Sequence, residues 1–599
     1  MKVDSEPMVS DDGLMVTLPA SLAAHDSAVT EGPQGQLGHR DLIAHTERLA
    51  PKMWEVTPQV WCVVGNGLSN QTFVEGPEGL IVIDTGESNE EMAAALAQVR
   101  TVTSAPVAAV LYTHFHYVAG TEAVMAEAGR DLPVWGHQGI VGNLRRVGVD
   151  LHAAAGRGLV HQFGMLLPQD GPDGIINVGL GLEYRRAEHA PFTPGFIPPT
   201  HEIDGPMSTT IAGLQVEFSL APSDADDSIT IWFPELSVCV NNLVWPALFN
   251  VFAIRGEEYR DPRILLNGLD HIAGLQPEHL VGAHGPPLSG REEVNHEVEV
   301  YRDSIQFLWD QTVRGINRGL TNEELVEFVQ LPSDYGRTYR TQQLYGLVEH
   351  HVRQIHAGLR GWFDGDESKL LAVPRAEKCR RFVEGFGGAD EVRSQVREAL
   401  ANDDIRWALE LASWLVHRVE PEAGGGLAAA EDEDRGLLAQ GLRMAAQRTT
   451  SSNIRNWCLT RALELEGRLD LTRFRTHRLN HRQILASEPE VYVEALRVLV
   501  DPARAAGIDA HVGFAFDGGE PSAGLHIRRG VAVPTQAALA ATFTGTVHLQ
   551  HDTWAAILSG RTTLADEVKA GNVAISGDQK LTLEAMHSFD VPGLSEGAI

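Results

Sequence analysis

The fold of this chain is decided by residues 80–116, which read LIVIDTG (80–86), EEMAAALAQVR (90–100) and PVAAVLYTHFH (106–116). The first and last pieces are apolar runs of the length of buried strands, and the middle piece has the composition of a helix. A strand, a helix and a second strand at this spacing predict α/β layers. Asp84 ends the first run and His114 closes the second, so the carboxyl ends of both strands are expected to face a functional site.

Further strands are predicted before this segment. Residues 60–65 and 72–74 are short β-type runs, separated by the turn signals GNG and EGPEG. The sequence up to about residue 40 is polar and irregular, which indicates an arm. After the segment, residues 149–215 are rich in Gly and Pro and predict long functional loops.

The second half of the chain changes character twice. Residues 290–465 are predicted to be mostly helical, and between 402 and 417 apolar residues recur at the spacing of one helix face. Asn402 or Asp403 is expected to cap that helix. Beyond about residue 480 the pattern predicts a helix, then strands joined by turns, then short helices that stop at glycine.

Composition narrows the function classes. A length of 599 residues suggests three to five domains, and 43% hydrophobic with 21% charged residues is typical of globular proteins. A net charge of −32 argues against nucleic acid or an anionic membrane as the main partner. The four scattered cysteines form neither a disulfide framework nor a zinc ribbon. Without a signal peptide or an apolar run of membrane-spanning length, the sequence predicts a cytoplasmic protein with no integral membrane segment.

The sharpest chemical signal is His114-Phe115-His116 at a strand end. Two histidines at this spacing on a loop can bind one ion, and zinc prefers such nitrogen ligands. The pair alone is weak, because two loop histidines without a metal are an equally good interpretation. His284, in LVGAHGPP, is a third candidate that could equally be a turn histidine. Acidic candidates lie in SDADDS, where Asp224 is preferred over Asp226 and Asp227, although an acidic run is more often a solvated loop.

Several longer segments resemble the alkyl sulfatases of the metallo-β-lactamase superfamily. The resemblance starts with GNGLSNQTFVEGPEGLIVIDTG and YTHFH and continues through FGMLLPQDGPDGIINVGLG, APSDADDSITIWFPELSVCVNN, ALFNVFAIRGEEYRDPRIL and VGAHGPP. QFLWDQTVRGINRGLTNEEL, GWFDGD and TSSNIRNWCLTRALELEG are similar to the helical dimerisation domain of that family, and the tail is similar to its sterol-carrier-protein-like domain. The resemblance covers roughly residues 45–590.

The resemblance implies an α/β metallo-β-lactamase-like sandwich (αββα), an all-α dimerisation domain and an α+β tail. Its expected divisions are an arm (1–42), the sandwich (43–300), the helical domain (301–470) and the carrier-like tail (471–599). It implies a homodimeric zinc hydrolase that cleaves a long-chain alkyl sulfate or related ester with metal-bound hydroxide. His114, His116, Asp224 and His284 would hold the metal, and Asn250 and Arg255 would bind the sulfate. Arg260 is expected to be a surface residue.

This chain differs from the family at the residues that hold a second zinc ion in the family. The family reads His-x-His-x-Asp-His before a Gly pair, whereas this chain reads HFHYVAGT (114–121), so the Asp-His is replaced by Val118-Ala119 or deleted after Tyr117. The bridging Glu of the family corresponds to Asn241, a poor zinc ligand. One zinc ion is therefore expected rather than two. Tyr117 either donates its hydroxyl to water or substrate, or packs its ring into the vacated space.

Two alternatives remain open at this level. In the first, the metal site has decayed and the dimer, with its carrier-like tail, binds amphiphilic or fatty ligands without catalysis. In the second, the chain is still a hydrolase, but the altered site suits a phosphoester or a thioester.

Overall fold

The structure is a computed structural model, which describes residues 28–147, 151–245, 251–332, 335, 338–420, 429–474, 479–536 and 543–596. Contacts divide the chain into two compact units, Met1–Val141 with Gly158–Asp470, and Gly142–Arg157 with Leu471–Ile599. Of the predicted arm, residues 1–27 lie outside the described part. Residues 28–42 are ordered, and they include a small antiparallel pair, β1 (Val29–Glu31) and β2 (Leu37–His39).

The decisive segment folds as predicted. The two apolar runs form β6 (Gly79–Ile83) and β7 (Val107–Leu111), which pair in parallel, and α3 (Asn89–Val99) joins them. These strands lie in the middle of a seven-stranded sheet of order β3-β4-β5-β6-β7-β8-β9. Its other members are β3 (Lys52–Thr57), β4 (Val60–Val64), β5 (Gln71–Gly76), β8 (Val134–His137) and β9 (His201–Ile203).

A second sheet of six strands packs face to face with the first. Its order is β10-β11-β12-β13-β14-β15, with β10 (Met207–Ile211), β11 (Leu214–Leu220), β12 (Ile229–Phe233), β13 (Val238–Asn241), β14 (His279–Gly282) and β15 (Leu288–Ser289). One apolar core holds side chains of both sheets, such as Ile81 and Leu111 from the first and Phe218 and Ile231 from the second. Each of these four residues is at most 1% exposed, so burial of the shared face stabilises the sandwich.

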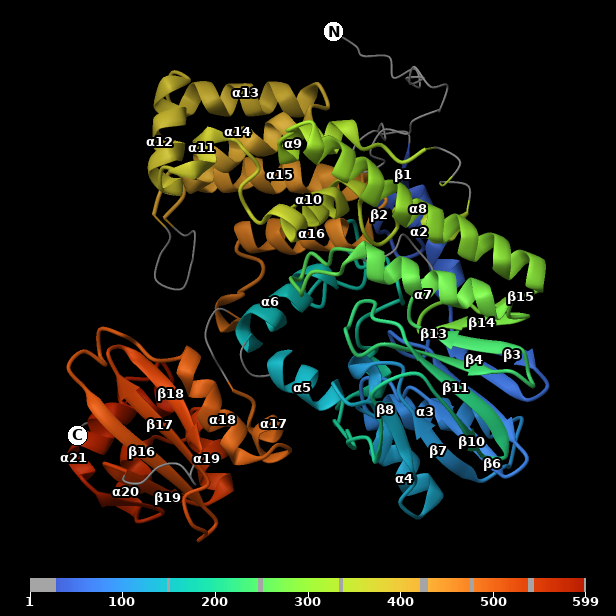
Figure 1. The fold of residues 1–599 in the computed structure, drawn as a ribbon. Coiled ribbons are helices and arrows are strands. Elements are labelled where there is room, and N and C mark those ends of the chain that lie inside the picture. Colours follow the sequence, from blue (N-terminus) through green and yellow to red (C-terminus); the bar gives the residue numbers. More distant parts are fainter. Residues whose placement is uncertain are drawn as a thin grey trace. The chain divides into compact units, whose positions relative to one another are not determined.

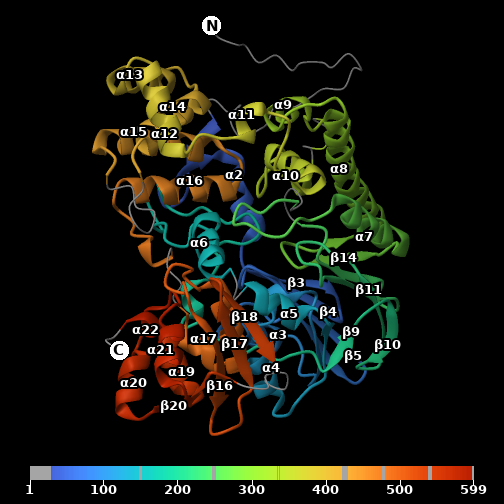
Figure 2. The same cartoon turned by 60° about the vertical axis from the view of Figure 1, so that its left-hand side comes forward.

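Helices cover the outer faces of the sandwich, as Figures 1 and 2 show. Helices α3 and α4 (Thr121–Ala128) accompany the first sheet. Helices α7 (Pro262–Leu275) and α8 (Arg291–Asn317) share a second core with the outward side chains Cys239 and Leu280 of the second sheet. The layers are therefore helix, sheet, sheet, helix, as expected for the αββα class.

The predicted helical region is confirmed. It contains α9 (Asn322–Phe328), α10 (Val348–Arg360), α11 (Glu367–Leu370), α12 (Arg375–Gly385), α13 (Ala389–Ala401), α14 (Ile405–His417), α15 (Asp432–Arg448) and α16 (Ser452–Leu465). The predicted cap of α14 was wrong by one or two positions, because the Asp404 side chain accepts from the Trp407 amide. The prediction for 149–215 missed α6 (His152–Gln162), whose two glycines obscured a helix in the sequence.

The tail has the predicted strands, together with one strand, β20 (Val573–Gly577), that the sequence did not predict. A five-stranded sheet of order β18-β17-β16-β19-β20 is built from β16 (Asp509–Phe516), β17 (Ala523–Arg528), β18 (Val531–Gln536), β19 (Gly545–Leu549) and β20 (Val573–Gly577). It shares one core with α19 (His551–Leu558). The four cysteines are buried and free, as expected. Across the described residues, none of the helices has the length and hydropathy needed to cross a bilayer.

Candidate metal and anion site

The site begins at the carboxyl end of β7, where the chain turns sharply through η3 (Phe115–Tyr117). Two backbone hydrogen bonds join this turn to the loop after β6: the Thr85 amide donates to the Tyr117 carbonyl at 2.8 Å, and the Ala119 amide donates to the Gly86 carbonyl at 3.0 Å. A Cβ at Gly120 would lie 2.2 Å from the Thr85 carbonyl oxygen, so only glycine fits there. The loop carrying both histidines is therefore held tightly against the end of the sheet.

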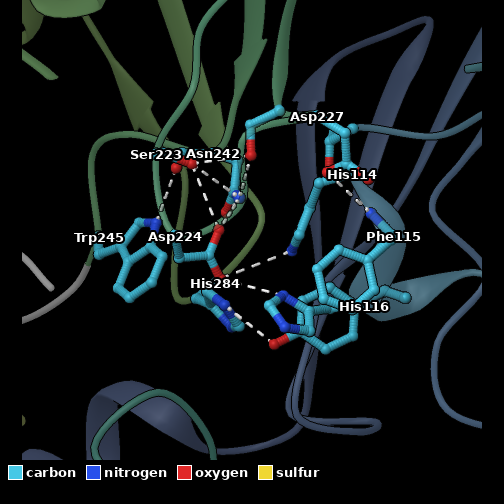
Figure 3. A network of polar contacts seen from close by, with 12 residues as sticks. His114, Phe115, His116, Ser223, Asp224, Asp227, Asn242, Trp245 and His284 are labelled. Atoms are coloured by element: carbon cyan, nitrogen blue, oxygen red, sulfur yellow. Dashed lines mark hydrogen bonds and ion pairs between the residues drawn. The ribbon is translucent and has the colours of Figure 1, made fainter. Parts of the chain in front are cut away.

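His114, His116 and Asp224 converge on one point, and their closest ligand atoms all lie within 4.8 Å of one another. The distance from Asp224 Oδ2 to His116 Nδ1 is 3.1 Å, and that to His114 Nε2 is 3.8 Å. Figure 3 shows both imidazoles directed toward the carboxylate. The histidines follow a strand of the first sheet and Asp224 precedes a strand of the second, so the group spans the two sheets.

The protonation states of this group suit a cation. Burial lowers the pKa of His114 to about 3, which leaves its ring neutral at pH 7. Burial alone would raise the pKa of Asp224, but the neighbouring His114 and His116, together with Arg260, hold it well below its usual value. An ionised carboxylate and a neutral imidazole therefore face each other.

A hydrogen-bond chain behind His114 fixes which nitrogen faces Asp224. Asp84 Oδ1 accepts from the Thr113 amide at 2.8 Å, and Oδ2 accepts from Thr113 Oγ1 at 2.7 Å. Burial raises the pKa of Asp84 to about 7, and in its ionised form Asp84 accepts the only hydroxyl hydrogen of Thr113, so that Thr113 Oγ1 accepts from His114 Nδ1, 2.8 Å away. The lone pair then lies on His114 Nε2, which is buried and has no hydrogen-bond partner. Metal-binding histidines are held in this manner by partners outside the ligand set.

Asp224 is held from the second sheet. Asn242 Nδ2 donates to its Oδ1 at 2.6 Å, and Ser223 Oγ donates to the same oxygen at 3.3 Å. The alternative acids lie elsewhere: Asp226 is exposed, and Asp227 is buried and accepts from the Phe115 amide at 3.4 Å.

Asn241, which the sequence resemblance placed at the family's bridging Glu, contacts backbone groups. Its Nδ2 donates to the Val281 carbonyl at 3.1 Å, and its Oδ1 accepts from the amides of Leu243 and Val244. It shapes the turn after β13 and is not a member of the three-residue group.

His284 lies beside that group without being one of its members. Its Nδ1 donates to the Leu68 carbonyl at 3.0 Å, so its Nε2 carries the lone pair and accepts from the Tyr117 hydroxyl at 3.3 Å. The Tyr117 ring packs against both His114 and His284, with its centroid 5.1 Å from that of His114 and 5.3 Å from that of His284. The structure thus brings together three of the four sequence-predicted ligands and pairs the fourth with a tyrosine.

The three-residue group fits a metal ion. A tetrahedral zinc with bonds of about 2.0–2.2 Å keeps its ligand atoms about 3.4 Å apart, between the two distances measured to Asp224 Oδ2. Two imidazoles and a carboxylate form a donor set typical of catalytic zinc, which keeps one position open. The buried Nε2 of His114, without a partner, is the atom that such an ion would satisfy.

Beside this group lies a cluster of charged side chains from the segment before α7. The Glu257 carboxylate pairs with Arg255 and also with Arg260, and its Oε1 lies 3.8 Å from His116 Nε2. Arg255 donates its backbone amide to Gln162 Oε1 at 3.0 Å, which anchors the segment. Asn250, the other predicted sulfate contact, lies outside the described residues.

The prediction that Arg260 is a surface residue is wrong. It is only 5% exposed, and burial lowers the pKa of its guanidinium. Its charge acts on Asp224 and on Tyr117. The charged sequence around it, RGEEYRD, contains no apolar pattern that could reveal this burial.

Two facing sheets between helices, with an His-x-His turn at the end of a parallel strand, define a hydrolase of the metallo-β-lactamase superfamily. The chain matches that superfamily over residues 64–117. Residues 321–468 match the alkyl sulfatase dimerisation family, and residues 479–594 match the alkyl sulfatase C-terminal family. The chain belongs to the alkyl sulfatase family.

The relatives agree over nearly the whole length. A linear primary-alkylsulfatase from a Pseudomonas species is 32% identical over 535 residues, covering 84% of this chain and 96% of the relative. An (R)-specific secondary-alkylsulfatase, also from a Pseudomonas species, is 27% identical over 541 residues, covering 88% of this chain and 79% of the relative. The solved structure of a double mutant of the sec-alkyl sulfatase PisA1 is 25% identical, with a TM-score of 0.79, covering 97% of this chain and 94% of that one.

Proposed function

We propose that this chain hydrolyses alkyl sulfate esters with a single zinc ion held by His114, His116 and Asp224. The observation that carries the proposal is the convergence of these three side chains within 4.8 Å, on two loops that follow strands of the two facing sheets. The names of the relatives, all alkylsulfatases, supply the substrate class. His284, paired with Tyr117, is left out of the ligand set.

The residues around the three metal ligands have two further roles, which are to bind the sulfate head group and to orient the ligands. Arg255 and Arg260 are suited to the sulfate head group, because two guanidinium forks offer charge-assisted hydrogen bonds to an oxyanion. Thr113 and Asp84 hold His114 in the tautomer that binds metal, and Asn242 fixes the rotamer of Asp224. When bound, the metal supplies Lewis acidity and makes water nucleophilic at neutral pH.

The experiment is metal analysis combined with turnover. The purified chain should contain about one zinc per polypeptide and release sulfate from dodecyl sulfate, and chelation should stop both. A folded protein that contains no metal and does not turn over substrate would contradict the proposal and favour the non-catalytic, amphiphile-binding alternative. If the protein contains metal and cleaves a phosphoester or a thioester but not dodecyl sulfate, the chain is a hydrolase with a different substrate.

We also propose that the chain is a homodimer. Its alkyl sulfatase dimerisation domain exposes large apolar side chains: Trp362 is 68% exposed, Leu370 57% and Leu371 90%. Exposed apolar residues grouped on one segment are typical of a protein interface. Light scattering should give twice the chain mass of 65.2 kDa, and the double change Trp362→Ser and Leu371→Ser should shift it toward the monomer.

A further inference from the structure

Glu257 lies where an anionic head group is expected to bind. Its Oε1 accepts from Arg255, and its Oε2 accepts from Arg260, so one carboxylate bridges both guanidinium groups. The side chains of Arg255 and Arg260 are only 12% and 4% exposed, and that of Glu257 is 20% exposed. The two arginines therefore have little surface left for a second anion while Glu257 is in place.

Glu257 is not placed to act as a metal ligand. The imidazole of His116 turns its Nδ1 toward Asp224, and the opposite nitrogen, Nε2, faces Glu257 at 3.8 Å. A carboxylate behind the ring cannot reach the ion that the front of the ring would bind. In the described part of the chain, the candidate metal group contains Asp224 as its carboxylate, without Glu257.

Glu87, another acid near Arg255, has partners of its own. It accepts from the Tyr184 hydroxyl at 3.3 Å and lies 3.7 Å from Arg185. Glu257 is thus the acid that forms ion pairs with both Arg255 and Arg260.

We propose that Glu257 is an internal competitor of the substrate, a carboxylate that occupies the Arg255–Arg260 anion pocket and is displaced by the sulfate head group. This inference rests on the proposed function, whose head group it concerns. A carboxylate and a sulfate present similar oxygen pairs to a guanidinium fork, so one can replace the other. The Glu257 side chain is 20% exposed and lies on a segment outside the helices and strands, so a change of its rotamer can move the carboxylate away from the arginines without a large change in the fold.

Because an anion must displace Glu257 before it can bind, the apparent affinity of the pocket for anions is weakened. If the pocket is free of Glu257 only about a tenth of the time, the apparent dissociation constant is about tenfold weaker than the intrinsic one. Glu257 would then be a specificity-determining residue, which keeps weakly binding anions out and admits a head group whose alkyl chain adds binding energy elsewhere.

The test measures the affinity for inorganic sulfate by titration calorimetry, with the intact metal-containing protein and its Glu257→Gln variant. The amide keeps the size and removes the charge, so E257Q is expected to bind sulfate about tenfold more tightly and to lower the KM for dodecyl sulfate by a similar factor. Glu258→Gln, the same change at the exposed neighbouring position, should leave both constants unchanged.

Weaker or equal sulfate binding by E257Q would overturn the inference. If E257Q does not fold, as judged by circular dichroism, Glu257→Asp gives the same decision, because its shorter side chain cannot bridge both arginines and should tighten sulfate binding by a smaller factor. A different result would contradict the proposed function alone. If the wild-type protein does not hydrolyse dodecyl sulfate but E257Q still binds sulfate more tightly, Glu257 competes with anions as inferred and the chain is not an alkyl sulfatase.

Discussion

Two sets of histidines at the candidate site differ in what their lone pairs face. His114 and His116 follow a strand of the first sheet, and His114 Nε2 and His116 Nδ1 both point at the carboxylate of Asp224. His284 follows β14 of the second sheet, and its Nε2 accepts a hydrogen bond from the Tyr117 hydroxyl. The first pair therefore faces an anionic ligand, whereas the acceptor of His284 is already satisfied.

The difference bears on the number of metal ions. Tyr117 lies in the same turn as His116, and it donates its hydroxyl to the His284 Nε2 atom that a metal ion would need. We therefore expect one metal ion, held by His114, His116 and Asp224, and each of the following changes tests this expectation.

The largest effect is expected from His114→Ala. This change removes a metal ligand, so the loss of metal affinity should exceed the roughly 100-fold that partners outside the ligand set cost. The matched variant His284→Ala, at the histidine paired with Tyr117, should retain its metal. Metal content after dialysis distinguishes the two variants, and an equal loss in both would show that His284 is also a metal ligand.

A smaller loss is expected from Asp224→Asn, which replaces the ionised carboxylate with a neutral amide of the same shape. Metal affinity should fall by about 100-fold, because the negative charge is removed from a buried site. Asp226→Asn, in the same loop but exposed, serves as the control and should bind metal like the wild type. Competition with a coloured chelator measures the metal affinity of both variants. A similar loss of affinity in D226N would indicate that Asp226 is also a metal ligand.

Thr113→Val tests the hydrogen-bond chain behind His114. Valine keeps the shape and removes the oxygen that accepts from His114 Nδ1, so metal affinity should fall by about tenfold. Chelator competition gives the affinity, and the spectrum of the cobalt-substituted protein reports whether the ligand geometry has shifted. An unchanged affinity would show that the tautomer is fixed without Thr113.

The smallest effect on metal binding is expected from Tyr117→Phe. The variant loses the hydroxyl that His284 Nε2 accepts from, and a buried acceptor without a donor lowers the free energy of unfolding by about 1–3 kcal/mol. Metal content should stay at the wild-type value. Denaturant titration checks the first statement and metal analysis the second, and a second bound ion in Y117F would mean that the phenol alone keeps it out.

Much of the sandwich could be predicted because its strands are strongly marked in the sequence. LIVI and VAAVL are fully apolar runs between turn signals, and they form the buried strands β6 and β7. His114 and His116 could be placed at a strand end for the same reason. Asp224 was chosen from three acids in one loop, and the structure brings that one to the histidines.

The rest depended on contacts that no local pattern encodes. Burial of Arg260 depends on how the segment before α7 folds against the sheets, and the sequence RGEEYRD shows only charge. The pairing of Tyr117 with His284 joins positions 167 residues apart, and the chain through Asp84 and Thr113 crosses between two strands. Such contacts are set by tertiary packing, which periodicity cannot reveal.

The position of the three-residue group has a mechanical consequence. His114 and His116 are carried by the first sheet and Asp224 by the second, so an ion bound between them is a crosslink through the mouth of the sandwich. Because the ion binds the folded chain more tightly than the unfolded one, every gain in metal affinity is also a gain in folding free energy. Metal supply would then set the stability of the fold as well as its chemistry.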